Sequence, residues 1–354
     1  MGETVIPLAD LRYAAPVPAI PDHLVAPTGL LSDQLGRPLR DLRISVTDRC
    51  NFRCSYCLPD GYRKAKGAPP NLSIDEIRRL VGGFAALGLW KIRLTGGEPT
   101  LRAEFLDIAK TVSGIEGIRQ IAITTNGYRL ARRAQDYADH GIGAINISID
   151  SLKAEKFHAI TGHDRLAEIL RGIDACKAAG IASIKLNSVL LKGLNDNELD
   201  DFIAFVVEHD LTLRFIEVMR TNDNPGYFIE HHLPGSFISD RLQSIGWLRQ
   251  SRQAGAGPAI EYANPTGPGR IGIIAPYSKD FCASCNRLRV SATGKLHLCL
   301  FGDGGIDLKP WLQDDAQKEE LIIRLQKLVA GKAPAHLLHQ GNSGATPHLA
   351  SIGG

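Results

Sequence analysis

Between about residue 41 and residue 220, short hydrophobic runs typical of strands alternate with longer segments that have helical hydrophobic spacing. Six short runs are rich in β-branched residues, as buried strands are. We expect strands at Leu42–Thr47, Lys91–Thr95, Gln120–Thr124, Ala144–Ile149, Ser183–Leu190 and Thr212–Glu217. Between them, helical spacing of apolar residues predicts helices at Ser73–Leu87, Leu130–His140, Leu166–Ala179 and Asn197–Glu208. Ser73 and Glu76 form a capping box that marks the start of the first helix.

This alternation of strands and helices predicts the fold class. Strands that alternate with helices pair in parallel, because each helix returns the chain to the same end of the sheet. The chain is therefore expected to be α/β, as an incomplete (β/α) barrel or an open doubly wound sheet. In both folds, functional side chains gather at the carboxyl ends of the strands.

The remainder of the chain follows other patterns. Residues 1–35 are rich in Pro and Ala and predict an extension, and residues 221–234 are polar and predict a loop. Residues 235–310 predict an irregular region of short strands and turns, and Gln313–Ala330 has helical spacing. The tail from Gly331 is expected to be mobile except at its end. We divide the chain at 1–35, 36–220, 221–330 and 331–354.

Composition narrows the possible functions. The chain has 354 residues, of which 44% are hydrophobic, and 41 basic against 38 acidic residues give a net charge of +3. That balance argues against a general nucleic-acid or membrane-surface binder. No apolar run reaches the roughly 18 to 20 residues that span a bilayer, and the amino terminus lacks the features of a signal peptide. Six of the seven cysteines cluster in two groups, which favours metal binding in a reducing cytoplasm.

The first trio of cysteines, Cys50, Cys54 and Cys57, follows the first expected strand with the spacing C-x3-C-x2-C. A zinc knuckle would need a fourth ligand, and no His or further Cys lies within twenty residues on either side. Three thiolates instead suit a four-iron cluster with one iron left open. That iron could bind the amino and carboxylate groups of S-adenosylmethionine (SAM).

The run Thr95–Pro99 reads Thr-Gly-Gly-Glu-Pro and follows the second expected strand. Its glycines allow the backbone to approach a ligand closely, and its carbonyl groups with Glu98 can accept hydrogen bonds from the SAM ammonium group. An isolated Gly-Gly pair would indicate an ordinary turn. Together, the cysteine loop and this run resemble the two signatures of the radical SAM superfamily.

The second trio of cysteines, Cys282, Cys285 and Cys299, has the spacing C-x2-C-x13-C. A zinc ribbon with His297 as the fourth ligand is one interpretation. Arg287 and Arg289 follow the second cysteine and would face the same side of a strand. Two guanidinium groups so placed suit a polyphosphate, which favours a nucleotide site beside the second trio.

From Gly36 to Gly354, the chain resembles the GTP 3′,8-cyclases, the molybdenum cofactor biosynthesis protein A family of radical SAM enzymes. The matching stretches are Gly36–Pro38, Asp41–Cys50, Lys91–Pro99, Thr124–Gly127, Asn146–Asp150, Arg214–Met219, the second trio with Arg287–Arg289, and the terminal Ile352–Gly354. Leu58 and Thr100 depart from the usual residues, although neither is at a ligand position. The resemblance implies an incomplete (β/α)6 TIM-like barrel with a smaller C-terminal α+β region.

The resemblance also implies roles for individual residues. The two trios would each hold a [4Fe–4S] cluster, the first binding SAM and the second binding the guanine of GTP. The expected SAM contacts are Tyr56, Gly97, Glu98, Ser148 and Met219. The expected GTP contacts are Arg43, Arg93, Thr124, Lys185, Arg287, Leu288 and Arg289, with Lys91 and Arg214 as weaker candidates. Arg43, Arg287 and Arg289 would position the substrate, and Gly353 and Gly354 would enter the active site.

The implied reaction is a radical cyclisation of GTP in the biosynthesis of the molybdenum cofactor. An adenosyl radical would remove the ribose C3′ hydrogen, and C3′ would then bond to guanine C8 to give (8S)-3′,8-cyclo-7,8-dihydroguanosine 5′-triphosphate. A homodimer and a downstream cyclic pyranopterin monophosphate synthase are further expectations. Two alternatives remain, namely a peptide-modifying radical SAM maturase with an auxiliary cluster and a zinc module that recognises nucleic acid.

Overall fold

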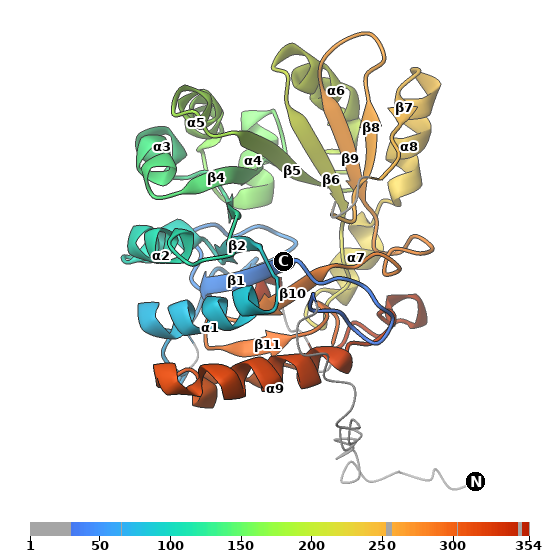
Figure 1. The fold of residues 1–354 in the computed structure, drawn as a ribbon. Helices are drawn as coiled ribbons and strands as arrows, with labels where there is room; N and C mark the ends of the chain where they lie inside the picture. Colours follow the sequence, from blue (N-terminus) through green and yellow to red (C-terminus); the bar gives the residue numbers. More distant parts are fainter. Residues whose placement is uncertain (1–29, 65, 253–256, 303, 346–348, 354) are drawn as a thin grey trace, which may run out of the picture.

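The computed structural model describes residues 30–64, 66–252, 257–302, 304–345 and 349–353 (Figure 1). The six expected strands form consecutive parallel neighbours of one sheet. They are β1 (Asp41–Thr47), β2 (Lys91–Gly96), β3 (Gln120–Thr125), β4 (Ile142–Ser148), β5 (Ser183–Leu190) and β6 (Thr212–Glu217). The expected α/β partial barrel is confirmed.

Helices cover the outside of this sheet (Figure 1). The four expected helices are present as α1 (Ile74–Ala86), α3 (Leu130–Asp139), α5 (Leu166–Ala178) and α6 (Leu199–Glu208). Two more were not predicted, α2 (Phe105–Ser113) and α4 (Ala154–Thr161). Each spans only about two turns, so few apolar positions were available to reveal the helical period.

The C-terminal third extends both edges of the partial barrel. On one side β10 (Arg287–Val290) pairs in parallel with β1, and on the other β9 (Arg270–Ile274) pairs in parallel with β6. The full order is β12-β11-β10-β1-β2-β3-β4-β5-β6-β9-β8-β7. The outer strands are β7 (Leu248–Arg249), β8 (Ile260–Ala263), β11 (Lys295–His297) and β12 (Ile306–Asp307). One sheet therefore joins residues that the domain boundary at 220 would separate.

Three expectations for the C-terminal third were wrong. The predicted loop at 221–234 contains α7 (Pro225–His231), in which Pro225 occupies the first turn, where a proline is tolerated. The predicted region of strands and turns begins with α8 (Gly235–Ser244). The tail also packs against the protein, since His336, Leu338 and Ile352 are buried.

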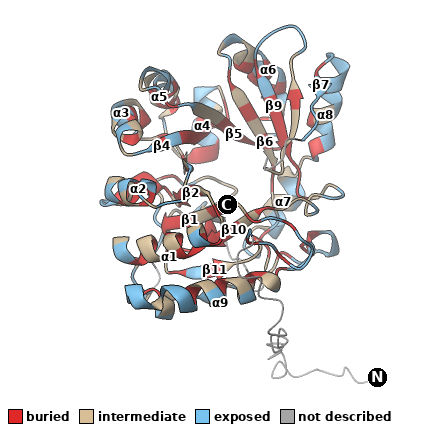
Figure 2. Cartoon of the chain, in the orientation of Figure 1, coloured by how far each residue is buried: buried red, intermediate tan, exposed pale blue. Residues whose placement is uncertain are grey.

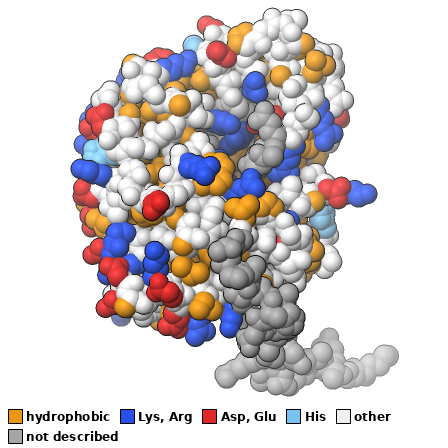
Figure 3. Space-filling view, viewed as in Figure 1, with side chains coloured by type: hydrophobic (Ala, Val, Ile, Leu, Met, Phe, Trp, Pro, Cys, Tyr) orange, Lys and Arg blue, Asp and Glu red, His pale blue; other side chains and the backbone are white. Residues whose placement is uncertain are grey.

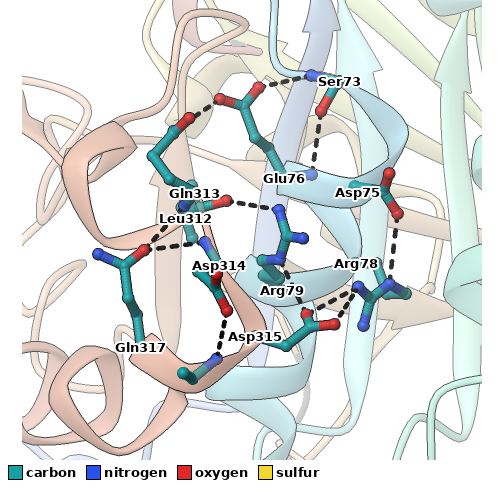
Figure 4. A network of polar contacts seen from close by, with 11 residues as sticks. Ser73, Asp75, Glu76, Arg78, Arg79, Leu312, Gln313, Asp314, Asp315 and Gln317 are labelled. Carbon is teal, nitrogen blue, oxygen red and sulfur yellow. Dashed lines mark hydrogen bonds and ion pairs between the residues drawn. The ribbon is translucent and has the colours of Figure 1, made fainter.

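Helix α9 (Lys318–Ala330) packs against α1, and a polar network joins α1 to the segment just before α9 (Figure 4). Arg78 and Arg79 both bind Asp315, each with a shortest nitrogen-to-oxygen distance of 2.8 Å. Next to them, Ser73 and Glu76 form the predicted capping box. Gly83 permits close packing, because a Cβ at this position would lie 2.7 Å from Leu321 of α9.

Buried residues fill the space between the sheet and its helices (Figure 2). Buried polar side chains also occur on the strands, including Ser45, Arg93, Asn146 and Arg289. Such groups are costly to bury without partners, so the barrel interior is the natural place to search for a site. In the described part of the chain, no helix has the length and apolar character needed to cross a bilayer.

Candidate active site

A central cavity of about 1280 Å³, including its open mouth, lies inside the barrel. Its wall brings together residues from opposite ends of the sequence. The predicted residues on this wall are Arg43, Tyr56, Arg93, Thr124, Ser148, Met219, Cys282, Cys285, Arg287, Arg289 and Cys299. The sheet pairing explains the arrangement, because Arg43 of β1 lies between Arg93 of β2 and Arg289 of β10 in register.

The first trio lines an adjoining cavity of about 790 Å³ at the carboxyl ends of the strands. Backbone hydrogen bonds hold its loop in place, with Arg53 N donating to Thr161 O and Ser55 N to Ile160 O. Phe52 is buried in the core and stacks on His163, with ring centroids 4.6 Å apart. The three cysteines are thus presented by a loop that is anchored at both its backbone and its aromatic side chain.

Four residues line both cavities, namely Tyr56, Thr124, Ser148 and Asp150. The Tyr56 hydroxyl donates to Asp150 over 2.9 Å, and Val189 N donates to the same carboxylate over 2.8 Å. Burial raises the pKa of Asp150 to about 6 despite these two donors. Of the expected SAM contacts, Tyr56 and Ser148 stand at this junction, Gly97 lines the cavity of the first trio, and Met219 lines the central cavity.

The glycines of the Thr95–Pro99 run bring two strand ends together. A Cβ on Gly96 would lie 2.1 Å from Thr47 O, and a Cβ on Gly97 would lie 2.4 Å from Arg49 O. Gly96 also has a φ of +153°. These glycines therefore allow β2 to pack against the segment that leads into the cysteine loop, a packing role that the sequence did not reveal.

Glu98 does not occupy the position we expected for a direct SAM contact. Its carboxylate is fully buried and accepts hydrogen bonds from the Thr100 and Thr125 hydroxyls, over 2.5 and 2.8 Å, and from Asn126 N, over 2.7 Å. It also lies outside the lining of both cavities. Burial and these donors make the Glu98 side chain a support beneath the site, and its contact with SAM stays a prediction.

The second trio forms part of the central cavity wall on a tight turn, in which Cys285 N donates to Cys282 O over 3.1 Å. The Arg37 side chain donates a hydrogen bond to Cys282 O over 2.8 Å. Although burial raises the pKa of the Cys285 thiol, Arg287 and Lys332 outweigh it and lower the pKa to about 7. A thiolate is therefore readily available at this turn.

Neither trio is arranged around a single metal ion. Among the described residues, no three His, Cys, Asp or Glu side chains converge closely enough to hold one. His297, the proposed fourth ligand of a zinc ribbon, is absent from the cavity lining, and its ring lies against Gly305. A four-iron cluster separates its thiolates over several irons, so three open cysteines fit a cluster better than a zinc ion.

Positive charge is concentrated and poorly neutralised in the barrel. The Nε atoms of Arg43, Arg93 and Arg214 are buried, and within the described chain they have no hydrogen-bond partner. Burial and the neighbouring Arg289 and Arg93 hold the pKa of Arg43 well below its usual value. Burial also lowers the pKa of Arg289 and of Arg214 to about 10. Such a set of guanidinium groups is suited to a polyanion, which would replace the missing partners.

Two of the expected GTP residues lie elsewhere. Leu288 is fully buried in the hydrophobic core, opposite Leu42 of β1, so its side chain does not reach the cavity. Lys185 lines a neighbouring cavity at the amino ends of the strands, which it shares with Lys91 and Arg214. Arg214, a weaker candidate from the sequence, belongs to both cavities and connects them.

The end of the tail enters the barrel. Arg289 donates to the Gly353 carbonyl over 2.5 Å. Gly353 has a φ of +64°, and a Cβ there would lie 2.1 Å from the Thr95 side chain, so only glycine fits this position. Gly354, the other expected tail residue, lies outside the described residues.

Similarity to known proteins agrees with this arrangement. Residues 44–206 match the radical SAM superfamily, and residues 211–338 match the family described as Molybdenum Cofactor Synthesis C. A protein of Aeromonas hydrophila named GTP 3′,8-cyclase is 54% identical over 92% of this chain and 96% of its own length. A protein of the same name from Stenotrophomonas maltophilia is 53% identical over 92% of this chain and 99% of its own length.

The chain belongs to the GTP 3′,8-cyclase family of radical SAM enzymes. Among solved structures, Streptococcus suis SuiB bound to S-adenosylmethionine aligns with a TM-score of 0.56, covering 83% of this chain and 68% of that chain. Its 12% sequence identity supports the likeness of fold alone. Membership of the radical SAM superfamily implies one [4Fe–4S] cluster and SAM, and the three half-buried cysteines of the first trio, which line one cavity, fit that cluster.

The structure of this GTP 3′,8-cyclase family member also reveals site residues that sequence reasoning missed. Asn187 and His336 line the central cavity, and both have a buried polar atom without a partner in the described chain. Asn187 could have been found from its place two residues after Lys185 on a strand, which puts it on the same face. His336 follows no strand or motif, so no sequence signal pointed to it.

Proposed function

We propose that this chain is a GTP 3′,8-cyclase that converts GTP into (8S)-3′,8-cyclo-7,8-dihydroguanosine 5′-triphosphate in molybdenum cofactor biosynthesis. Curated relatives of that name match nearly the whole chain, so the proposal does not depend on one domain alone. The match to Molybdenum Cofactor Synthesis C places the C-terminal third in the same pathway.

The observation that carries the substrate assignment is the set of buried arginine Nε atoms that have no hydrogen-bond acceptor in the described chain. Arg43 and Arg93 expose no Nε to solvent, and each lacks a hydrogen-bond acceptor there within the described chain. Arg93 keeps one bond, from Nη1 to the Thr124 hydroxyl over 3.4 Å, and a buried donor left without an acceptor costs about 1–3 kcal/mol. A triphosphate would supply the missing acceptors, and the charge-assisted hydrogen bonds would offset that cost. An uncharged peptide substrate would leave these groups unsatisfied, which disfavours the maturase alternative.

The cavity of the first trio is the proposed SAM site. Cys50, Cys54 and Cys57 would hold the cluster, and bound SAM supplies a 5′-deoxyadenosyl radical after one-electron reduction. The chain's own part is to orient SAM. Tyr56 is held by Asp150, and Ser148 presents its hydroxyl at the opening into the central cavity.

The central cavity is the proposed GTP site, and its residues would act by positioning. Arg43, Arg287 and Arg289 would hold the substrate so that the ribose faces the adjoining SAM cavity. Arg287 lies over the Phe281 ring at 5.8 Å, which limits its movement. Small displacements of bound reactants cost large rate factors, so these fixed side chains matter even though they do not react.

We further propose that the second trio holds a second [4Fe–4S] cluster with one open iron for the guanine base. Support comes from three half-buried cysteines that all line the wall of the GTP cavity, beside Arg287 and Arg289. The low pKa of Cys285 would favour ligation, since a thiolate is the binding form.

Partners and location complete the proposal. A homodimer and a downstream cyclic pyranopterin monophosphate synthase are family expectations, and the electron donor is unidentified. The clustered free thiols suit a reducing cytoplasm. We expect no nucleic acid or membrane partner, because the net charge of +3 is modest.

Anaerobic turnover tests the proposal. The reconstituted enzyme is incubated with SAM, dithionite and GTP, and the products are separated by mass. We expect 5′-deoxyadenosine and the cyclised nucleotide in equal amounts. Formation of 5′-deoxyadenosine without a cyclised guanosine product would reject GTP as the substrate and keep the radical chemistry.

The division of roles is tested with Arg287→Ala and Arg289→Ala. Both variants should lose GTP turnover by roughly 10- to 100-fold, because each removes a charge-assisted hydrogen bond worth about 1.5–3 kcal/mol. Both should keep the iron content of the wild-type enzyme. A loss of iron from the second trio in either variant would contradict the assignment of these arginines to the substrate.

A further inference from the structure

The barrel has a second mouth that the proposed reaction does not use. A cavity of about 2070 Å³, including open solvent, lies at the amino ends of the strands. Lys91, Thr212 and Arg270, which begin β2, β6 and β9, all line it. Because the strands are parallel, their amino ends lie opposite the cysteine loop, which follows the carboxyl end of β1.

This amino-end mouth carries two layers of positive charge. The inner layer is half-buried and consists of Lys91, Lys185 and Arg214. The outer layer is exposed and includes Arg249, Arg270 and Lys279. Figure 3 shows Lys and Arg side chains gathered around the central hollow of the molecule.

Few negative groups oppose this charge. Glu261 and Asp280 are the carboxylates that line the same cavity. Within the described residues, Arg249, Arg270 and Lys279 form no ion pair, whereas Lys91 lies 4.0 Å from Asp41. The outer cations are therefore available to attract an anion from solution.

The amino-end mouth adjoins the central cavity. Arg214 and Phe281 belong to the walls of both. At the other end, the cavity of the first trio is narrowed by the tail, because Ala350 lines it and Gly353 packs on Thr95. The cations along this direction run from the exposed Arg249, Arg270 and Lys279 through the half-buried Lys185 and Arg214 to the buried Arg289.

We propose that GTP enters through the amino-end mouth, guided by Arg249, Arg270 and Lys279, while SAM enters from the cysteine-loop end. This inference rests on the proposed function. Charged clefts of this kind raise association rates by roughly 10- to 1000-fold at low salt. The two substrates then use separate routes, and the outer cations act on the capture of GTP without touching the reacting atoms.

The test replaces the three outer cations together, as Arg249→Gln, Arg270→Gln and Lys279→Gln. All three are exposed, so the fold should tolerate the changes. The matched control removes three exposed charges from outer helices, as Lys110→Gln, Arg171→Gln and Lys318→Gln. Steady-state kinetics are measured anaerobically for GTP and for SAM at about 50 and 500 mM ionic strength, which changes the screening length about threefold.

We expect kcat/KM for GTP to fall about tenfold in the mouth variant at low ionic strength and less than about twofold at high ionic strength. Its kcat, its kcat/KM for SAM and its inhibition constant for uncharged guanosine should match the wild-type values. The control variant should match the wild type in all respects.

Three results would overturn the inference. They are an unchanged kcat/KM for GTP, an equal loss for SAM and GTP, and the same loss in the control variant. Each of these leaves GTP cyclisation itself intact. A wild-type enzyme that cleaves SAM without cyclising GTP would instead remove the proposed function and the entry route with it.

Discussion

The two cysteine trios have the same number of thiols but opposite electrostatic surroundings. Burial raises the pKa of Cys50 to about 11, with Glu98 adding to the effect, and raises that of Cys57 to about 12. In the second trio burial also raises the pKa of Cys282, yet Arg287 and Lys332 lower that of Cys285 to about 7. Carboxylates therefore lie near the first trio, and cations lie near the second.

This difference corresponds to the ligand proposed for each trio. SAM carries a sulfonium and an ammonium group, so nearby carboxylates such as Asp150 and Glu98 are compatible with it. GTP carries several negative charges and requires the arginines beside the second trio. The contrast teaches that three cysteines do not define a site by themselves, because the charges around them select what the open iron can bind.

The largest effect is expected from removing one cysteine of each trio. Cys54→Ala should abolish 5′-deoxyadenosine formation, whereas Cys285→Ala should abolish GTP cyclisation and retain SAM cleavage. Each variant should contain about four iron atoms per chain rather than about eight, as measured by iron analysis after anaerobic reconstitution. A wild-type protein that binds zinc and almost no iron would contradict both cluster assignments.

Thiol labelling of the metal-free protein measures the contrast directly. At pH 8, Cys285 is mostly thiolate because its pKa is about 7, while Cys57 is protonated because its pKa is about 12. Iodoacetamide should therefore modify Cys285 about a hundredfold faster, after allowance for the lower nucleophilicity of a low-pKa thiolate. Peptide mass spectrometry gives the rates. Arg287→Gln should slow the labelling of Cys285 alone, and equal rates at both cysteines would refute the contrast.

The pH dependence of GTP binding tests whether the positive charge of Lys185 contributes to GTP binding. Burial lowers the pKa of Lys185 to about 8, so this amine loses its positive charge as the pH rises from 7 to 9. Lys185 lines the cavity that shares Arg214 with the GTP cavity, so the loss of its charge should lower GTP affinity by up to about tenfold, since about one-tenth of the lysine remains charged at pH 9. Isothermal titration calorimetry in the absence of SAM measures this GTP affinity at each pH. In Lys185→Arg the charge persists, so a decline as steep as that of the wild type would exclude this lysine.

The smallest effect is expected at the tail between the two trios. Gly353→Ala introduces a methyl group that meets the Thr95 Cγ2 atom and a φ of +64° that disfavours alanine. The tail should leave the barrel, and KM for GTP should rise about three- to tenfold. Thr95→Ser removes the clashing Cγ2 atom and should restore part of the loss in the double variant. Additive effects of the two substitutions would argue against the observed packing.

The sequence predicted the barrel well because each of the six barrel strands can be recognised from the residues within it. The run Ser183–Leu190 was predicted with both ends correct, whereas Ala144–Ile149 was displaced from the observed Ile142–Ser148. The pairing of β10 with β1 was not predictable, because it joins segments more than 200 residues apart and leaves no local pattern. Helix α7 was missed for a different reason, since Asn224 and Pro225 indicate a turn as readily as a helix start.

Sequence motifs predicted the location of the cysteine ligands well. They predicted less well which cavity each polar or charged side chain lines. The first trio lines a cavity at the carboxyl ends of the strands, where a loop that follows the first expected strand should lie, and the second trio lines the central cavity. Glu98 was assigned to SAM from its chemistry, but Thr100, Thr125 and Asn126 take up its hydrogen-bonding capacity. Lys185 was placed in the central cavity, although its position near the start of β5 puts it at the opposite end.

The pairing of β10 with β1 and of β9 with β6 constrains how the newly synthesised chain can fold. Until residues 270–290 have been synthesised, β1 and β6 present unpaired hydrogen-bonding edges, which are templates for aggregation. Domains emerge from the ribosome with the amino terminus first, so the first cysteine loop exists well before its barrel can close. Nascent chains therefore depend on the last third for protection, and a truncation near residue 220 is expected to yield insoluble protein rather than a smaller enzyme.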